Sequence, residues 1–225
     1  KQQQQAFYAT VAHELKTPVT VSRGPLEALR DGVISSPDDV RAYYNQILTE
    51  TKGLQRLISD LLELSRLQNV GFSLDMGDVD LRDLLGDVAM SAGALCDRKG
   101  VVFVCEEPKS GKTIRGDYTR LRQMLLAVVD NAVKFTEPGK TVTLAFDGET
   151  VVIADEGSGI AQEDLPHIFE RFRRAHGGQD GTGLGLAIVS EVAKRHHIVI
   201  NVESRMGQGT TFKFTFPNEI SDGLE

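Results

Sequence analysis

Residues 5–30 read QAFYATVAHELKTPVTVSRGPLEALR, and the spacing of their apolar side chains decides how the fold begins. These side chains recur at steps of three and four, which places them on one stripe of a helix: Phe7, Val11, Leu15, Pro18, Val21, Pro25 and Leu29. Each of the two prolines removes a backbone donor and crowds the preceding turn, so we expect the helix to bend near Pro18 and Pro25. The segment therefore predicts a long amphipathic helix with a bend.

A second amphipathic helix is predicted after a break at residues 31–35. Ser36 is placed as its N-cap, and Pro37 takes the first helical position. The apolar stripe that follows is close to a heptad repeat: Val40, Tyr44, Ile47, Leu54, Leu57, Ile58, Leu61, Leu64 and Leu67. Two such helices bury little by themselves, so we favour a symmetric dimer in which two hairpins form a four-helix bundle. The alternative is a solitary hairpin packed on its own second domain.

The rest of the chain predicts a separate domain of helices and strands. The pattern lapses into polar residues and glycines at 68–77, so we assign a helical hairpin to residues 1–70, a connector to 71–77 and a second domain to 78–218. Its helices are predicted at 80–98, 117–135 and 184–196, and its strands at 101–106, 141–146, 150–154, 198–204 and 210–216. Short turns between strands, with helices on one side, predict an α/β sandwich with a mixed, largely antiparallel sheet. The fold class is therefore α+β.

Length, charge and cysteine content exclude several classes of protein. A chain of 225 residues with 40% hydrophobic side chains has enough material for two modest globular units. The formal net charge of -7, with the acidic residues dispersed, argues against nucleic acid as a partner. Cys96 and Cys105 form no metal-like or disulfide pattern and are interpreted as core residues in a reducing compartment. No run approaches the roughly 20 apolar residues of a membrane span, so we expect no membrane contact within this chain.

The first candidate for chemistry is the segment HELKTP at residues 13–18. An exposed imidazole at His13 has a nucleophilic ring nitrogen, and a carboxylate at Glu14 can accept the proton of the other nitrogen. Thr17 lies one turn further on, where its hydroxyl can orient a water against a group on the histidine. Taken alone, His13 and Glu14 also fit an ordinary surface pair.

Two further segments suggest a nucleotide. Asn131 and Lys134 share a helix face, so a neutral oxygen ligand for Mg²⁺ and a cation for phosphate can meet there. Asp155 leaves a strand into a turn with Gly157 and Gly159, where a carboxylate can accept a hydrogen bond from an exocyclic amine and the backbone can approach a ring. Each spacing alone also fits plain surface residues or a plain turn.

A glycine-rich loop, GTGLG at residues 181–185, opens the last predicted helix. Free backbone N–H groups and the helix dipole favour phosphate at such a position. The spacing is like that of a dinucleotide-binding fingerprint, but residues 176–180 are polar and glycine-rich where that fingerprint requires a strand. A Rossmann fold is therefore not predicted.

In their order along the chain, these motifs resemble those of the histidine kinase family. The family's boxes match, in order, residues 13–18 (phosphoacceptor), 130–135 (asparagine), 155–159 (first glycine), 169–172 (phenylalanine) and 181–185 (second glycine). The resemblance covers nearly the whole chain, and five collinear boxes are far more specific than any one of them. It implies a dimerising phosphoacceptor hairpin followed by an ATP-binding domain.

The resemblance also implies a role for each matching residue. His13 would accept phosphate, with Glu14 and Thr17 assisting. ATP and Mg²⁺ would be bound by Asn131, Lys134, Phe135, Asp155, Gly157, Gly159, Phe169, Arg174, Gly181, Thr182, Gly183, Leu184 and Gly185. Within this set Asn131 would hold Mg²⁺, Lys134 and Arg174 the phosphates, and Asp155 the adenine amine, with Phe135 against the nucleotide. Residues 173–180 would form a mobile lid.

The implied activity is ATP-dependent autophosphorylation followed by transfer to an aspartate of a response regulator, with phosphatase activity on that regulator. The chain would be the cytoplasmic portion of an inner-membrane sensor whose upstream part is absent. The connector would act as a hinge that lets the ATP-binding domain reach His13 and then leave. The main alternative is a nucleotide-binding regulatory module without kinase activity.

One departure from the family bears on the reaction. The residue four before Asn131 is commonly a second Asn in histidine kinases and a water-activating Glu in the related hydrolytic ATPases, but here it is Ala127. A methyl group cannot act as a general base, so an ATPase that hydrolyses ATP directly is disfavoured. The remaining histidines have no carboxylate partner at a useful spacing and are interpreted as structural or solvated: His167, His176, His196 and His197.

Overall fold

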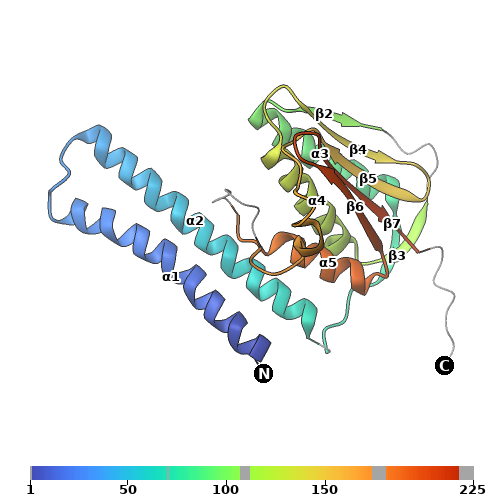
Figure 1. Ribbon diagram of the computed structural model, residues 1–225, viewed down its shortest axis with the longest axis horizontal. Coiled ribbons are helices and arrows are strands. Elements are labelled where there is room, and N and C mark those ends of the chain that lie inside the picture. The colour runs from blue at the N-terminus through green and yellow to red at the C-terminus, as the bar shows by residue number, and fades with distance from the viewer. Residues whose placement is uncertain (1, 70, 107–111, 174–180, 218–225) are drawn as a thin grey trace.

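A helical hairpin projects from an α/β domain in the computed structural model, which describes residues 2–69, 71–106, 112–173 and 181–217 (Figure 1). The hairpin consists of α1 (Gln2–Arg30) and α2 (Pro37–Gln68). The domain follows as β1 (Gly77–Asp80), α3 (Leu81–Lys99), β2 (Val102–Cys105), β3 (Thr113–Gly116), α4 (Tyr118–Phe135), β4 (Thr141–Phe146), β5 (Thr150–Asp155), the 3-10 helix η1 (Leu165–His167), α5 (Gly185–Arg195), β6 (Val199–Arg205) and β7 (Gly209–Thr215). The predicted α+β fold class is confirmed.

The start of α2 follows the predicted pattern. Pro37 opens the helix and two aspartates occupy its first turn, where they complement the positive end of the helix dipole. The side chain of Ser36 makes no capping hydrogen bond, although its carbonyl accepts the amide of Val40. In the preceding helix, α1 continues without interruption through Pro18 and Pro25.

The main sheet has five strands in the order β2-β4-β5-β7-β6. Only β2 and β4 pair in parallel and the other neighbours are antiparallel, so the predicted mixed, largely antiparallel sheet is confirmed. In Figure 1, α4 and α5 lie between this sheet and the hairpin. A separate antiparallel pair, β1 with β3, was missed by the sequence analysis, because these strands read GDVD and TIRG and lack the apolar run that marks β2.

The core of the domain lies between the sheet and its helices. Burial alternates along β4 and β5, which turns Val142, Leu144, Val151 and Ile153 toward the helices at 0 to 1% exposure. Each fully buried aliphatic side chain of this kind contributes roughly 1.5–3 kcal/mol. Cys96 is buried as predicted, but the core prediction for Cys105 is wrong, because that residue is exposed at the end of the edge strand β2.

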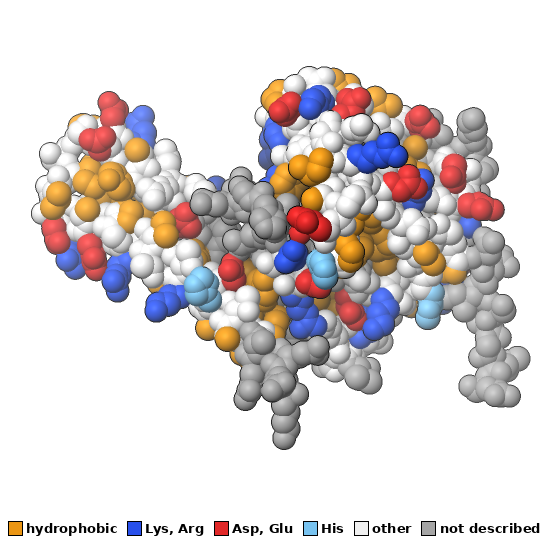
Figure 2. Space-filling view, viewed as in Figure 1, with side chains coloured by type: hydrophobic (Ala, Val, Ile, Leu, Met, Phe, Trp, Pro, Cys, Tyr) orange, Lys and Arg blue, Asp and Glu red, His pale blue; other side chains and the backbone are white. Residues whose placement is uncertain are grey.

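The apolar side chains of the hairpin form two surfaces, one buried and one exposed. Leu57, Leu64 and Leu67 are buried within a single chain, where α2 packs against α5. Further apolar side chains of the hairpin stay exposed: Val19, Val21, Leu26, Tyr44, Leu48, Ile58 and Leu62. Figure 2 shows hydrophobic side chains gathered on this part of the molecule. The hairpin therefore has apolar surface left for a partner.

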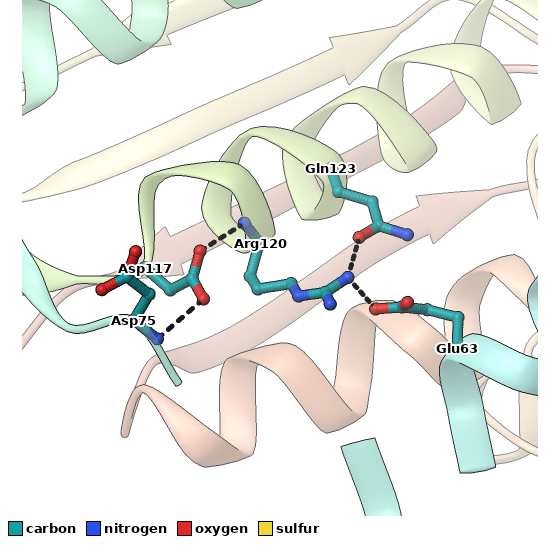
Figure 3. A network of polar contacts seen from close by, with 5 residues as sticks. All are labelled: Glu63, Asp75, Asp117, Arg120 and Gln123. Carbon is teal, nitrogen blue, oxygen red and sulfur yellow. Dashed lines mark hydrogen bonds and ion pairs between the residues drawn. The ribbon is translucent and has the colours of Figure 1, made fainter. Parts of the chain in front are cut away.

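The segment between α2 and β1 is bonded to the domain. The guanidinium of Arg195 donates to the carbonyls of Asn69 and Phe72, at 3.0 and 2.9 Å. The amide of Asp75 donates to the carboxylate of Asp117, which also caps α4 (Figure 3). These bonds hold the predicted connector in this arrangement of the two domains.

Candidate functional site

His13 lies on the exposed side of α1, with its side chain 80% accessible. Its Nδ1 is 3.9 Å from Oε1 of Glu14, which is longer than a hydrogen bond but close enough for one to form after a small rotation. The hydroxyl of Thr17 donates to the carbonyl of His13 at 3.2 Å. Among the described residues, the imidazole makes no hydrogen bond or ion pair with the second domain. The ring nitrogen Nε2 is therefore open to an incoming group.

The last turns of α4 present three of the predicted residues: Asn131, Lys134 and Phe135. Nζ of Lys134 lies 4.9 Å from the centre of the Phe135 ring, which is 42% exposed. The amide of Asn131 is half-buried and makes no hydrogen bond to a described residue. Nζ of Lys99 donates to the carbonyl of Val133 at 2.9 Å and to that of Lys134, which offsets the negative end of the helix.

Asp155 ends β5 and organises the first glycine box. Its Oδ1 accepts the amides of Gly157 at 2.8 Å and Thr210 at 3.3 Å. Burial raises the pKa of the Asp155 carboxyl above its ordinary value, and these two bonds oppose the shift. Within the described residues Oδ2 accepts no hydrogen bond, so this oxygen can receive one from a ligand amine.

The glycines of this box lie against neighbouring backbone. A Cβ on Gly157 would lie 2.7 Å from the carbonyl oxygen of Phe135, which accepts the amide of Ser158. Gly159 has a φ of +71°, and a Cβ there would collide with the carbonyl of Arg205. The box is therefore clamped between the end of α4 and the turn that joins β6 to β7.

We expect Gly159→Ala to lower the free energy of unfolding by about 2 kcal/mol or more, because it combines a left-handed backbone with a backbone collision. Gly148→Ala is the matched control, since its φ is +103° but no atom lies within 4 Å of the added Cβ. Chemical denaturation measures both. Equal losses in the two variants would show that the close contact at Gly159 carries no energy.

The second glycine box meets both the asparagine and phenylalanine boxes. A Cβ on Gly181 would lie 3.0 Å from Nζ of Lys134, so the predicted phosphate cation sits beside this loop. The carbonyl of Gly183 accepts the amide of Phe172 at 2.8 Å. The hydroxyl of Thr182 accepts the amide of Leu184 at 3.3 Å, just before α5 begins. The asparagine box, the phenylalanine box and the second glycine box are thus neighbours in the folded domain.

The phenylalanine box also contacts the hairpin, which the sequence analysis did not foresee. Phe169 and Phe172 pack against the core, and Phe172 has a φ of 61°, unusual for a bulky residue. Its ring lies 5.9 Å from the ring of Phe7, over which Arg171 places its guanidinium at 5.0 Å. The sequence analysis placed Phe7 on the apolar stripe of α1, but nothing in the sequence predicted its contact with Phe172.

The contacts of two other histidines show their roles. Nε2 of His196 accepts the amide of Asp117, so Nδ1 carries the proton and donates to the carbonyl of Val192. Burial lowers the pKa of His196, which is structural as predicted. The prediction that His167 lacks a carboxylate partner is wrong: its Nδ1 lies 2.7 Å from Glu170, one helical turn on. Arg174 and His176 lie outside the described residues.

Two family models match the chain in the order that the geometry suggests. Residues 3–70 match the His Kinase A (phospho-acceptor) domain, and residues 116–220 match the histidine kinase-, DNA gyrase B- and HSP90-like ATPase. The chain belongs to the histidine kinase family. The hairpin that carries His13 is its phosphoacceptor domain, and the five-stranded domain is its nucleotide-binding domain.

Individual relatives match over most of this chain. The sensor protein SrrB of Staphylococcus aureus is 32% identical over 224 residues, which are 96% of this chain and 38% of SrrB, so the chain spans about two fifths of that relative. The structure of the Acinetobacter baumannii histidine kinase AdeS has a TM-score of 0.69 at 26% identity, covering 92% of this chain and 98% of AdeS. Full-length ShkA in complex with AMPPNP has a TM-score of 0.67 at 32% identity, covering 93% and 45%.

No helix in the described part of the kinase is long and apolar enough to cross a membrane. In the same residues, no group of three or more His, Cys, Asp or Glu side chains could hold a metal by itself. Asn131 fits a magnesium site only as one oxygen ligand beside nucleotide phosphates, since Mg²⁺ is commonly bound through few protein groups, substrate phosphates and water.

Proposed function

We propose that the chain phosphorylates His13 with ATP and passes the phosphoryl group to an aspartate of a response-regulator protein. The observation that carries the proposal is the convergence of Lys134, Asp155 and the second glycine box around one region, on a chain that also presents an exposed His13 beside Glu14. ShkA, a 32% identical relative in structure, is described in complex with AMPPNP, which supports nucleotide binding at the corresponding domain.

In the proposed complex, Oδ2 of Asp155 accepts the adenine amine and the Phe135 ring lies against the nucleotide. Lys134 and the free amides at the start of α5 hold the phosphates, where the helix dipole also favours negative charge. Magnesium, held by Asn131 and the phosphates, would neutralise charge on the transferring group. Phe169, Gly157 and Gly159 shape the pocket, and Arg174 is assigned to the phosphates.

The reaction itself needs an in-line nucleophile. Nε2 of His13 attacks the γ-phosphorus, the bond from that phosphorus to the bridging oxygen breaks, and ADP leaves with the electron pair. Glu14 accepts or polarises the proton on Nδ1. Because His13 does not contact the nucleotide-binding domain in the described residues, this domain must leave its present position on α2 before transfer.

Transfer of the phosphoryl group to the regulator, and its later hydrolysis from the regulator, complete the cycle. The aspartate carboxylate of the regulator attacks the phosphorus on Nε2, the bond from nitrogen to phosphorus breaks, and Nδ1 takes back its proton from Glu14, which regenerates neutral His13. Thr17, one turn along α1, orients a water for hydrolysis of the phosphorylated regulator. We also propose that two chains pair through the exposed apolar residues of their hairpins, and that the chain is the cytoplasmic portion of a membrane sensor.

Incubation with magnesium and ATP labelled on the γ-phosphate tests the function. The chain is expected to acquire label in a linkage that acid breaks and alkali leaves intact, on the peptide that contains His13. Steady release of free phosphate without labelled protein would instead indicate a hydrolytic ATPase. Nucleotide binding with neither label nor release would indicate a regulatory module.

A further inference from the structure

The nucleotide-binding domain is held against α2 by a contact surface with a polar rim. Beside the buried leucines of α2, Glu63 forms an ion pair with Arg120 of α4, which also bonds to Gln123 (Figure 3). The two charged side chains are only 12% and 17% exposed, so solvent screens them weakly. Loss of either partner would leave a poorly solvated charge without its counter-ion. The pair therefore favours this docked arrangement over others that would separate the two charges.

Asp60, one turn before Glu63 on α2, reaches the second glycine box. Its Oδ2 accepts a hydrogen bond of 2.6 Å from the hydroxyl of Thr182. That hydroxyl accepts the amide of Leu184, the residue directly before α5. Burial raises the pKa of the Asp60 carboxyl, and the hydrogen bond from Thr182 opposes the shift. A carboxylate of the hairpin is thus bonded to the loop assigned to phosphate.

The start of α5 favours an anion. The first amides of a helix have no partner within it, and α5 carries no acidic residue in its first turn. Asp60 supplies a negative charge to this end of the helix through Thr182. The phosphates of a nucleotide would need the same hydroxyl and the same helix end, and they would repel the carboxylate.

We propose that Asp60 competes with nucleotide phosphates for the second glycine box, so that docking of the domain on α2 and nucleotide binding weaken each other. The proposal rests on the proposed nucleotide-binding function. Because such coupling is reciprocal, a bound nucleotide weakens the contact with α2 and favours the released domain that transfer to His13 requires. Loss of the carboxylate removes the competition without touching a residue assigned to the nucleotide.

The proposal is tested by measuring, with calorimetry, how tightly each protein binds a non-hydrolysable ATP analogue in the presence of magnesium. Asp60→Asn removes the charge but keeps an acceptor for Thr182, and Asp60→Ala removes both. Asp39→Asn is the matched control, because it makes the same charge change at an exposed position in the first turn of α2. We expect Asp60→Ala to bind the analogue about fivefold more tightly than wild type, Asp60→Asn to lie between, and the control to match wild type.

Adenosine separates phosphate competition from a general opening of the site. Its affinity should be the same in all four proteins, because it has no phosphate to compete with Asp60. If the Asp60 variants bind the analogue no more tightly than wild type, or bind adenosine more tightly to the same degree, the competition does not exist. If none of the four proteins binds the analogue, the proposed function itself fails.

Discussion

Replacing His13 by asparagine is expected to abolish labelling of the chain by ATP while leaving its affinity for the nucleotide unchanged. The amide of asparagine has no basic lone pair on nitrogen, so no nucleophile remains at this position of α1. Nucleotide binding should persist, since the described contacts of His13 are confined to Glu14 and Thr17 on its own helix. Phosphate incorporation and calorimetric binding are measured on the same preparation.

His197→Asn is the matched control for the loss of an imidazole. His197 is exposed two residues after the end of α5 and has a φ of 54°, a conformation that asparagine accepts readily. This variant should label at the wild-type rate. Persistent labelling of His13→Asn at another histidine would refute the assignment of the phosphoacceptor, even with nucleotide binding intact.

Replacing Asn131 by alanine is expected to lower the rate of autophosphorylation about 100-fold or more. Charge neutralisation by a metal supplies several kcal/mol to phosphoryl transfer, and each 1.36 kcal/mol is a factor of ten in rate. The half-buried amide makes no hydrogen bond to a described residue, so its loss should change the fold little. Labelling rates across a range of magnesium concentrations measure the effect, which should shrink as magnesium rises.

Asn201→Ala, on the exposed edge strand β6, is the matched control and should label normally. Mixing Asn131→Ala subunits with His13→Asn subunits adds a second result. Labelling of the mixture well above the rate of either variant alone would show that one subunit phosphorylates its neighbour. A rate for Asn131→Ala within twofold of wild type at low magnesium would exclude the residue as a metal ligand.

Local sequence patterns predicted most of the secondary structure and identified the boxes. Apolar residues at helical steps fixed α1 and α2, and alternation in β4 and β5 fixed the centre of the sheet, because both patterns report burial directly. The short strands β1 and β3 escaped detection, since their pairing joins residues 33 or more positions apart and leaves no local trace. Cys105 was misplaced because its apolar neighbours do not reveal that β2 is an edge strand.

The sequence by itself determined which residue types stand in the five boxes, and it placed every box except the phenylalanine box on a helix, at a strand end or in a loop, because helix periodicity, glycine turns and motif order are local properties. Only the tertiary structure decided that α2 turns Leu57, Leu64 and Leu67 to its own nucleotide-binding domain, that Phe172 meets Phe7, and that Asp60 bonds Thr182. Those contacts join surfaces that are each compatible with several partners. The packing of two domains against each other, and not any pattern along the chain, selects among them.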